Sequence, residues 1–138
     1  MIIDANNMVL GRLASFVAKK ALLGENIQVV NCEKAVITGD KKGILKKYQK
    51  RSEVGRPKKG PFQPKAPNLF VRKVIRGMLP YKKNRGREAY KKIMCHFSVP
   101  ENLKDGTPTK VDGADVLKMS NIKYLKVERI CKFLGWEK

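Results

Sequence analysis

The sequence predicts an α/β fold: a three-layer α/β/α arrangement with a small, mostly parallel central sheet and a basic extended arm. Two short apolar runs, at residues 1–4 and 27–31, flank an amphipathic helical pattern, and this order is typical of a βαβ unit with parallel strands. Prolines at positions 57, 61, 64 and 67 exclude a helix or the interior of a sheet, so this stretch predicts the arm. The length of 138 residues suits one domain with one core, at residues 1–138.

The first helix is predicted by apolar residues that recur every three or four positions. They are Leu10, Leu13, Ala14, Val17, Ala18 and Ala21. Gly24 ends this helix, because glycine readily takes the left-handed conformation that closes a helix C-terminus. Gly11 and Arg12, at the start of the helix, fit either anion binding by the helix N-terminus or an ordinary helix entry. Residues 35–38 form either a third strand or a tight connection.

A second helix is predicted over residues 41–51, with Ile44, Leu45 and Tyr48 on its inner face. Lysines and arginines fill most of its outer positions, and acids able to pair with them are almost absent nearby. Many proteins carry such a run of charge as a solvated face. The lack of acids here favours a surface that faces phosphates.

The arm covers residues 55–67, where basic residues alternate with the prolines. Its two glycines, Gly55 and Gly60, are spaced as in a phosphate-binding loop. However, Pro61 stands where that motif needs lysine, and no serine or threonine follows to hold magnesium. We therefore reject a nucleotide-binding loop.

A third helix begins near Asn68 and is marked by an apolar stripe. The stripe consists of Phe70, Val71, Val74, Ile75 and Met78. Glycine costs about 1 kcal/mol relative to alanine inside a helix. Gly77 therefore predicts close approach of its backbone either to a neighbouring element or to a phosphate. Pro80 ends the helix, residues 81–86 form a turn, and residues 87–94 form a further short helix.

The C-terminal part is predicted to add a strand at residues 95–99, a surface loop at 101–114 and a last helix. The apolar face of that helix consists of Val127, Ile130, Cys131 and Leu134. Gly135 caps the helix, so that Trp136 folds back on its last turn as an anchor at the edge of the core.

Charge is concentrated in the middle of the chain. The whole chain has 31 Lys and Arg against 12 Asp and Glu, a formal net charge of +19. Residues 41–92 hold 19 of these basic residues and 2 of the acids, whereas the remainder is nearly neutral. This distribution predicts a folded platform with a basic helix–arm–helix insert at about 41–92. Self-repulsion on this scale implies a polyanionic partner.

Other classes of site find little support. His96 is the one histidine, and we expect it in a strand. Cys32, Cys95 and Cys131 are far apart among apolar residues, so we expect buried reduced thiols. The N-terminus lacks a secretion-signal pattern and no apolar run is long enough to span a membrane, so a cytoplasmic protein is expected. We find no catalytic set, metal-ligand cluster or cofactor motif.

These observations predict a nucleic-acid-binding protein that contacts backbone phosphates and gains specificity from shape. The residues predicted to bind these phosphates are Arg12, Lys41, Lys42, Lys46, Lys47, Lys50, Arg51, Arg56, Lys58, Lys59, Lys65, Arg72, Arg76, Lys82, Lys83, Arg85 and Arg87. Aromatic residues are 7% of the chain and do not alternate along the strands, so a single-strand stacking module does not fit. We expect the arm to be mobile without RNA, because only Phe62 offers it an apolar contact.

Four stretches carry a resemblance to a known family. They are VLGRLAS at residues 9–15, VVNCEKAVITGDK at 29–41, IRGMLP at 75–80 followed by Gly86, and KYL through LGW at 123–136. In this order they resemble the large-subunit ribosomal protein thirteen family over nearly the whole chain. The arm, with GPF at 60–62 and AP at 66–67, is similar to the archaeal and eukaryotic branch. Lys126 stands where that family commonly has a small capping residue.

The resemblance implies a three-layer α/β/α fold and a structural role in the ribosome. It also implies direct binding and folding of large-subunit ribosomal RNA beside neighbouring ribosomal proteins, without enzymatic activity, a cofactor or a small-molecule substrate. Two alternatives stay open from the residues. One is a free RNA chaperone or DNA-compacting protein. The other is a small RNA-processing enzyme that depends on an acid such as Asp40.

Overall fold

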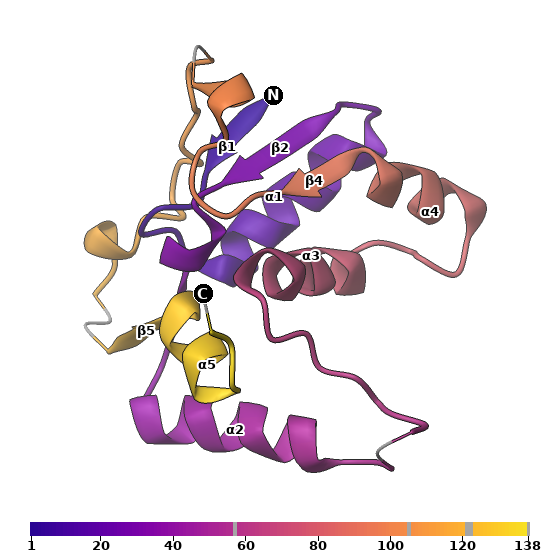
Figure 1. Cartoon of the computed structure of the whole chain (residues 1–138). Helices are drawn as coiled ribbons and strands as arrows, with labels where there is room; N and C mark the ends of the chain where they lie inside the picture. The colour runs from indigo at the N-terminus through magenta and orange to yellow at the C-terminus, as the bar shows by residue number, and fades with distance from the viewer. Residues whose placement is uncertain (57, 105, 121–122, 138) are drawn as a thin grey trace.

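Three short parallel strands form the main sheet in the order β1-β2-β4. They are β1 (Ile2–Asp4), β2 (Ile27–Val30) and β4 (Ile93–Cys95), with Val29 opposite both Ile3 and Cys95. The structure, a computed structural model, describes residues 1–56, 58–104, 106–120 and 123–137. In Figure 1 the three strands lie in the upper part of the view, with helices below them. The predicted α/β fold with a small, mostly parallel sheet is therefore confirmed.

Helix α1 (Leu10–Leu22) connects β1 to β2 and completes the predicted βαβ unit. All six apolar residues of its predicted inner face are buried. Gly24 follows the helix with φ of +102°, and its backbone N–H donates to the carbonyl of Ala21 at 3.0 Å. The periodicity and the glycine stop were thus both correct predictions.

The segment left open at residues 35–38 is a strand, but it lies outside the main sheet. Strand β3 (Val36–Thr38) pairs antiparallel with β5 (Tyr124–Lys126), with Ile37 opposite Leu125. This two-stranded ribbon brings the C-terminal part of the chain beside the end of the N-terminal unit. Helix α5 (Val127–Phe133) follows β5 directly.

Helix α2 (Lys41–Glu53) begins at Asp40, whose carboxylate accepts a hydrogen bond from the backbone N–H of Gly43 at 3.2 Å. Ile44 and Tyr48 are buried and Leu45 is half-buried, as predicted for the inner face. In Figure 1, α2 lies at the bottom with α5 between it and the sheet, and the arm runs from the end of α2 back to α3.

Helix α3 (Pro67–Met78) packs against α1 and contributes Phe70, Val71 and Ile75 to the core. Met78, predicted as part of this stripe, is 41% exposed, whereas Leu79 just beyond the helix is buried. The helix ends there because the residue before a proline is disfavoured in the α conformation.

The elements after Pro80 differ from the prediction in their boundaries. Helix α4 (Asn84–Lys91) replaces the helix predicted at 87–94 and ends before Ile93. Strand β4 begins at Ile93, because the backbone groups of Ile93–Cys95 pair with β2. The strand predicted at 95–99 retains only its first residue, and Ser98 has a left-handed φ of 55° that interrupts extended backbone.

The C-terminal helix ends as predicted. Gly135 has φ of +88°, its N–H donates to the carbonyl of Lys132 at 3.0 Å, and the N–H of Trp136 donates to Cys131 at 2.9 Å. These two bonds form a Schellman motif. The ring of Trp136 lies 5.4 Å from the ring of Phe97, which anchors the end of the chain.

The long loop after β4 contains two short 3₁₀ turns, Glu101–Leu103 and Val116–Lys118. Thr109 donates to the carbonyl of Ile2 at 2.9 Å and accepts from the N–H of Asp4 at 3.1 Å. The predicted surface loop therefore covers the outer edge of β1, which limits pairing of that edge with another strand.

The cysteines and the histidine are structural residues. Cys32, Cys95 and Cys131 are buried free thiols, as predicted. A hydrogen bond with Cys95 and burial raise the pKa of Cys32, and burial raises the pKa of Cys131 to about 12. His96, which was predicted to lie in a strand, instead lies directly after β4, and its Nε2 is 2.6 Å from Oε1 of Gln28.

Candidate nucleic-acid interface

The predicted RNA-binding residues lie on α2, the arm, α3, the following turn and α4. Six are on α2, four on the arm, two on α3, two in the turn at 82–83 and two on α4, whereas Arg12 lies on α1. All of them are exposed except Arg72, which is half-buried. We call the fifteen exposed predicted residues between positions 41 and 87 the cationic surface. Arg12 lies apart from them in sequence and donates to the carbonyl of Gly113.

The cationic surface has no acidic counterpart within the described part of the chain. The ion pairs found among the described residues are Lys20–Glu25, Lys104–Glu101 and Lys132–Glu128, and none includes a predicted RNA-binding residue. The two acids of this segment bond to neutral side chains instead: Glu53 to Gln49 at 2.8 Å and Glu88 to Asn84 at 3.4 Å. The positive charge is therefore left uncompensated by the protein itself.

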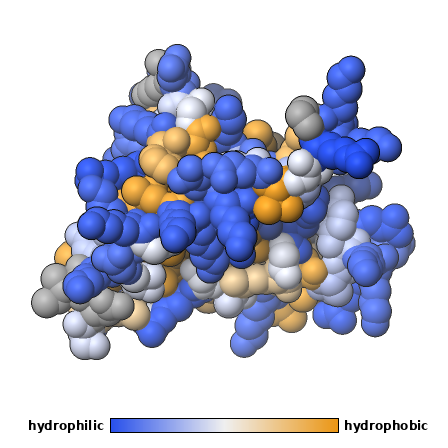
Figure 2. Space-filling view, turned by 90° about the horizontal axis from the view of Figure 1, so that it is seen from below, coloured by the Kyte–Doolittle hydropathy of each residue, from blue (hydrophilic) through white to orange (hydrophobic). Residues whose placement is uncertain are grey.

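Hydrophilic side chains cover most of the side on which α2 lies. Figure 2 shows this side from below, with apolar patches between the hydrophilic residues. Exposed apolar residues of the same segment include Phe62, Leu69 and Tyr81. A surface of this kind offers charge for phosphates together with apolar area for sugars and bases.

A stack of two arginines and two tyrosines joins α3 to α4. The guanidinium of Arg72 lies 4.6 Å from the centre of the Tyr90 ring, and that of Arg76 lies 5.0 Å from the Tyr81 ring. The two tyrosine rings meet edge to face at 5.4 Å. Cation–π contacts of this kind hold the arginines in place before any ligand arrives. Sequence reasoning missed this stack, although arginines four positions apart on one helix were a signal.

Tyr48 supports a third stacked arginine on the other side of α3. The guanidinium of Arg51 lies 5.5 Å from the centre of the Tyr48 ring, and the Tyr48 ring lies 5.0 Å from that of Phe70. Tyr48, on the inner face of α2, therefore holds the guanidinium of Arg51 in position. Burial raises the pKa of the Tyr48 hydroxyl, so this ring stays neutral beside the arginine.

Lys73, which the sequence did not single out, holds the arm against α3. Its amine donates to the carbonyl of Phe62 at 3.1 Å and to Oε1 of Gln63 at 2.7 Å. Burial lowers the pKa of Lys73, and the charges of Arg76 and Arg51 lower it further. Phe62 itself is 71% exposed, so its ring gives the arm little apolar anchoring, and the mobility of the arm without RNA stays a prediction.

The arm is extended over only part of its length. The N–H of Gly60 donates to the carbonyl of Arg56 at 3.0 Å, and the N–H of Arg56 donates back to Gly60 at 3.3 Å. This bridge closes a tight turn, which brings Lys58 and Lys59 to its tip. Pro57, one of the four prolines that predicted the arm, lies outside the described residues.

Two glycines near Pro80 differ in their surroundings. A Cβ on Gly77 would meet no atom within 4 Å, so the predicted approach of this residue to a neighbouring element is wrong. Its approach to a phosphate stays a prediction. Gly86 is the closely packed one: a Cβ there would lie far inside van der Waals contact with the carbonyl of Pro80.

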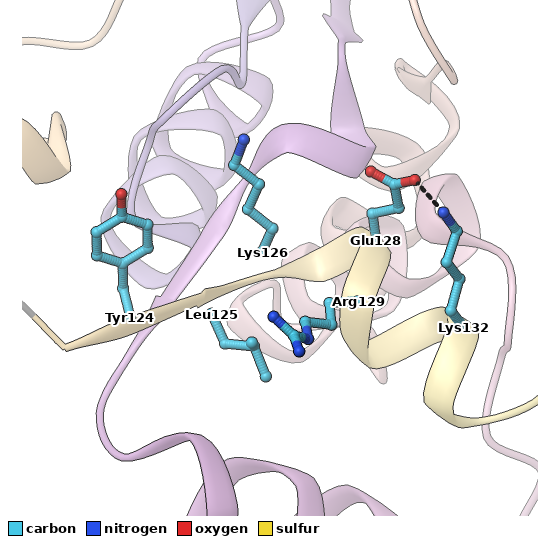
Figure 3. A pocket seen from close by; sticks show the side chains of 6 residues that line it. All are labelled: Tyr124, Leu125, Lys126, Glu128, Arg129 and Lys132. Atoms are coloured by element: carbon cyan, nitrogen blue, oxygen red, sulfur yellow. Dashed lines mark ion pairs between the residues drawn. The ribbon is translucent and has the colours of Figure 1, made fainter.

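A further basic hollow of about 380 Å³ lies between β5 and α5, in the near-neutral part of the sequence. Figure 3 shows its lining, in which Lys126 and Arg129 are accompanied by the ion pair of Lys132 with Glu128 at 2.7 Å. None of these residues was predicted to bind RNA. Lys126 is also the N-cap residue of α5, and it makes no side-chain capping bond.

The described residues also bear on metal binding, membrane crossing and catalysis. In the described ranges, no three His, Cys, Asp or Glu side chains gather as a metal ion would require. Among those same residues, every helix is too short or too polar to cross a membrane. Asp40, the acid that an RNA-processing enzyme would use, serves as the N-cap of α2.

Comparison with known proteins agrees with the resemblance seen in the sequence. Residues 1–102 match the family described as Ribosomal protein L13. The chain is 48% identical to large ribosomal subunit protein uL13 of Methanococcus maripaludis, over 98% of this chain and 97% of that protein. It is 44% identical to the protein of the same name from Methanopyrus kandleri, over 99% of this chain and 87% of that protein. With the Haloarcula marismortui protein it shares 43% identity over 100% and 92%. The chain therefore belongs to the ribosomal protein L13 family, in its archaeal branch.

Proposed function

We propose that this protein is a structural constituent of the large ribosomal subunit that binds and helps to fold large-subunit ribosomal RNA. The observation that carries the proposal is the cationic surface, whose fifteen exposed cations have no acidic partner among the described residues. The names of the relatives support the ribosome as its location, and hence the cytoplasm. Neighbouring ribosomal proteins are its other proposed partners, and the role needs no catalysis, cofactor or small-molecule substrate.

The proposed binding acts through phosphates and through shape. Lysines on α2 and on the arm supply point charges, which attract the RNA backbone without reading its sequence. Arginines stacked on tyrosines supply planar donors in fixed positions, and these suit paired hydrogen bonds to phosphate oxygens. Because the donors are spread over α2, the arm, α3, the following turn and α4, they fit RNA segments that lie side by side in a folded RNA. The protein would thereby neutralise phosphates where RNA helices approach each other.

The organisation that we propose is a single domain at residues 1–138 in which the segment at about 41–92 forms the binding part. Its two helices on either side of the arm also contribute to the core, through Tyr48 of α2 and Phe70 of α3. Binding and stability are therefore linked in this segment. Variants that test RNA binding should replace exposed side chains without contacts inside the protein.

The test is the salt dependence of binding to large-subunit ribosomal RNA fragments. If the protein makes about 6–10 phosphate contacts, its affinity falls roughly 10³- to 10⁵-fold between about 50 and 200 mM salt. A double variant, Arg85→Gln with Arg87→Gln, should bind more weakly with a shallower slope. The matched control, Lys110→Gln with Lys118→Gln, removes the same charge outside the cationic surface and should bind as the unmodified chain does. A flat salt dependence would contradict the proposal.

Two further measurements separate the alternatives. Sedimentation of a cell extract should place nearly all of the protein with large subunits, whereas a free RNA chaperone or DNA-compacting protein would stay in lighter fractions. An RNA-processing enzyme would show turnover that depends on an acid. Asp40→Asn should therefore change no RNA cleavage or modification assay, and it should affect only the start of α2.

A further inference from the structure

Two hollows in the cationic surface meet at Gly77. The first, of about 480 Å³, lies between the last turn of α3 and the loop that follows, and Arg76, Lys82 and Lys83 line it. The second, of about 270 Å³, lies between α2, the arm and α3, and Arg51 and Lys73 line it. Gly77 belongs to the lining of both hollows. Because they share Gly77 in their linings, we treat the two hollows as one groove that crosses α3 at a residue without a side chain.

Neither the packing nor the backbone conformation of the protein requires glycine at position 77. It lies in the last turn of α3 with ordinary helical backbone, since it is not among the residues with positive φ. A Cβ would meet nothing within 4 Å, so alanine would fit and would favour the helix. The bare backbone is therefore unexplained by packing or by backbone conformation. Close approach of an external chain is the remaining physical reason for a glycine here.

The groove has cations on both sides of this point and an apolar floor. Arg76 on one side and Arg51 on the other are each stacked on a tyrosine, so their guanidinium groups are already positioned. The amine of Lys73 uses two of its three donors on the arm and keeps one for a ligand. None of the described residues that line either hollow is acidic, whereas Val74 and Leu79 provide apolar surface.

We infer that this groove, which we call the Gly77 groove, holds the sugar–phosphate backbone of one RNA strand that passes directly over Gly77. The phosphates on either side of the crossing point are bound by Arg76 with Lys82 and Lys83, and by Arg51 with Lys73. The sugars lie on the apolar floor. This inference rests on the proposed RNA binding and gives it one defined subsite, where affinity depends on the absence of a side chain as well as on charge.

The experiment compares glycine variants in the full chain. Gly77→Ala and Gly77→Leu add uncharged groups that favour the helix and fill the crossing point. Gly43→Ala is the matched control, because Gly43 is also an exposed helical glycine whose added Cβ would meet nothing within 4 Å. Binding to a large-subunit ribosomal RNA transcript is measured at fixed salt, and the thermal midpoint of each free protein is measured beside it.

We expect Gly77→Ala to weaken binding about tenfold, because the added methyl group displaces the strand far enough to lose one hydrogen bond from a flanking cation, and Gly77→Leu to weaken it further. Gly43→Ala should bind as the unmodified chain does, and none of the three variants should lower the thermal midpoint. Unchanged affinity in both Gly77 variants would overturn the groove. If both Gly77 variants bound normally but the Arg85→Gln, Arg87→Gln double variant bound more weakly than the unmodified chain, RNA binding by the cationic surface would stand without the groove. If the unmodified chain showed flat salt dependence, both ideas would fail.

Discussion

Gly86 is the residue on which the geometry of the turn after Pro80 depends. A Cβ at this position would lie 2.9 Å from the backbone nitrogen of Tyr81 and closer still to the carbonyl group of Pro80. All of these are backbone atoms, so no change of side-chain rotamer can relieve the contact. Gly86→Ala must therefore push the start of α4 away from the turn, or distort the turn itself.

The expected cost follows from two opposing effects. Overpacking of this kind costs about 1–3 kcal/mol, and the helix preference of alanine returns at most about 1 kcal/mol. The net loss should be about 1–2 kcal/mol of the free energy of unfolding. For a chain of this length, that loss lowers the thermal midpoint by roughly 3–7 °C. Because Tyr81 supports Arg76, the same variant should also weaken RNA binding.

Thermal unfolding followed by circular dichroism measures this effect. Gly77→Ala is the matched control, since it is the same substitution nine positions earlier at a site with open space. The thermal midpoint should be lower for Gly86→Ala and unchanged or higher for Gly77→Ala. If Gly86→Ala melted at or above the unmodified chain, the close packing of the turn on α4 would be refuted.

Two other predictions concern the arm and alkaline stability. Lys73→Met removes the amine that bonds to Phe62 and Gln63, so trypsin should cut the arm faster. Lys42→Met should leave the rate unchanged, and equal rates in both variants would show that Lys73 does not hold the arm. Cys131 has its pKa raised from 9.0 to about 12 in the folded protein. As pH rises from 9.0 towards about 12, the Cys131 thiol loses its proton in the unfolded chain before it does so in the folded protein. The free energy of unfolding therefore falls by up to about 1.4 kcal/mol per pH unit. Cys131→Val should make this slope shallower in urea unfolding, with the remainder coming from Cys32, and an unchanged slope would contradict the assigned burial.

The parts of the fold that depend on neighbouring residues were predictable from the sequence. The inner face of α1 and its stop at Gly24 follow from periodicity and from glycine's backbone freedom, both of which are local. The partner of β3 was not predictable, because β5 is more than eighty positions away and carries no distinguishing pattern. The boundary between α4 and β4 was predicted wrongly for the same reason, because pairing with β2 determines where the strand begins and local propensity does not.

The candidate site was likewise predictable only in its local features. Its positive charge could be predicted from the sequence, because a run of cations without acids needs no tertiary information. The residues that position those cations were not readable, since the tyrosine stack and the anchoring of the arm by Lys73 arise only when α2, α3 and α4 come together. The two glycines illustrate the limit most clearly. The sequence favoured Gly77 for close approach, whereas the packing inside the protein requires Gly86.

The most direct test of the cationic surface is ultraviolet crosslinking of ribosomal RNA to this protein in intact large subunits, with the crosslinked peptides identified by mass spectrometry. We predict crosslinks concentrated in residues 41–92, including the peptides that contain Lys58, Lys65 and Arg85. Lys19 and Lys104 are exposed cations outside this segment and serve as internal controls. Crosslinks concentrated at those two positions, with none between residues 41 and 92, would contradict the central claim.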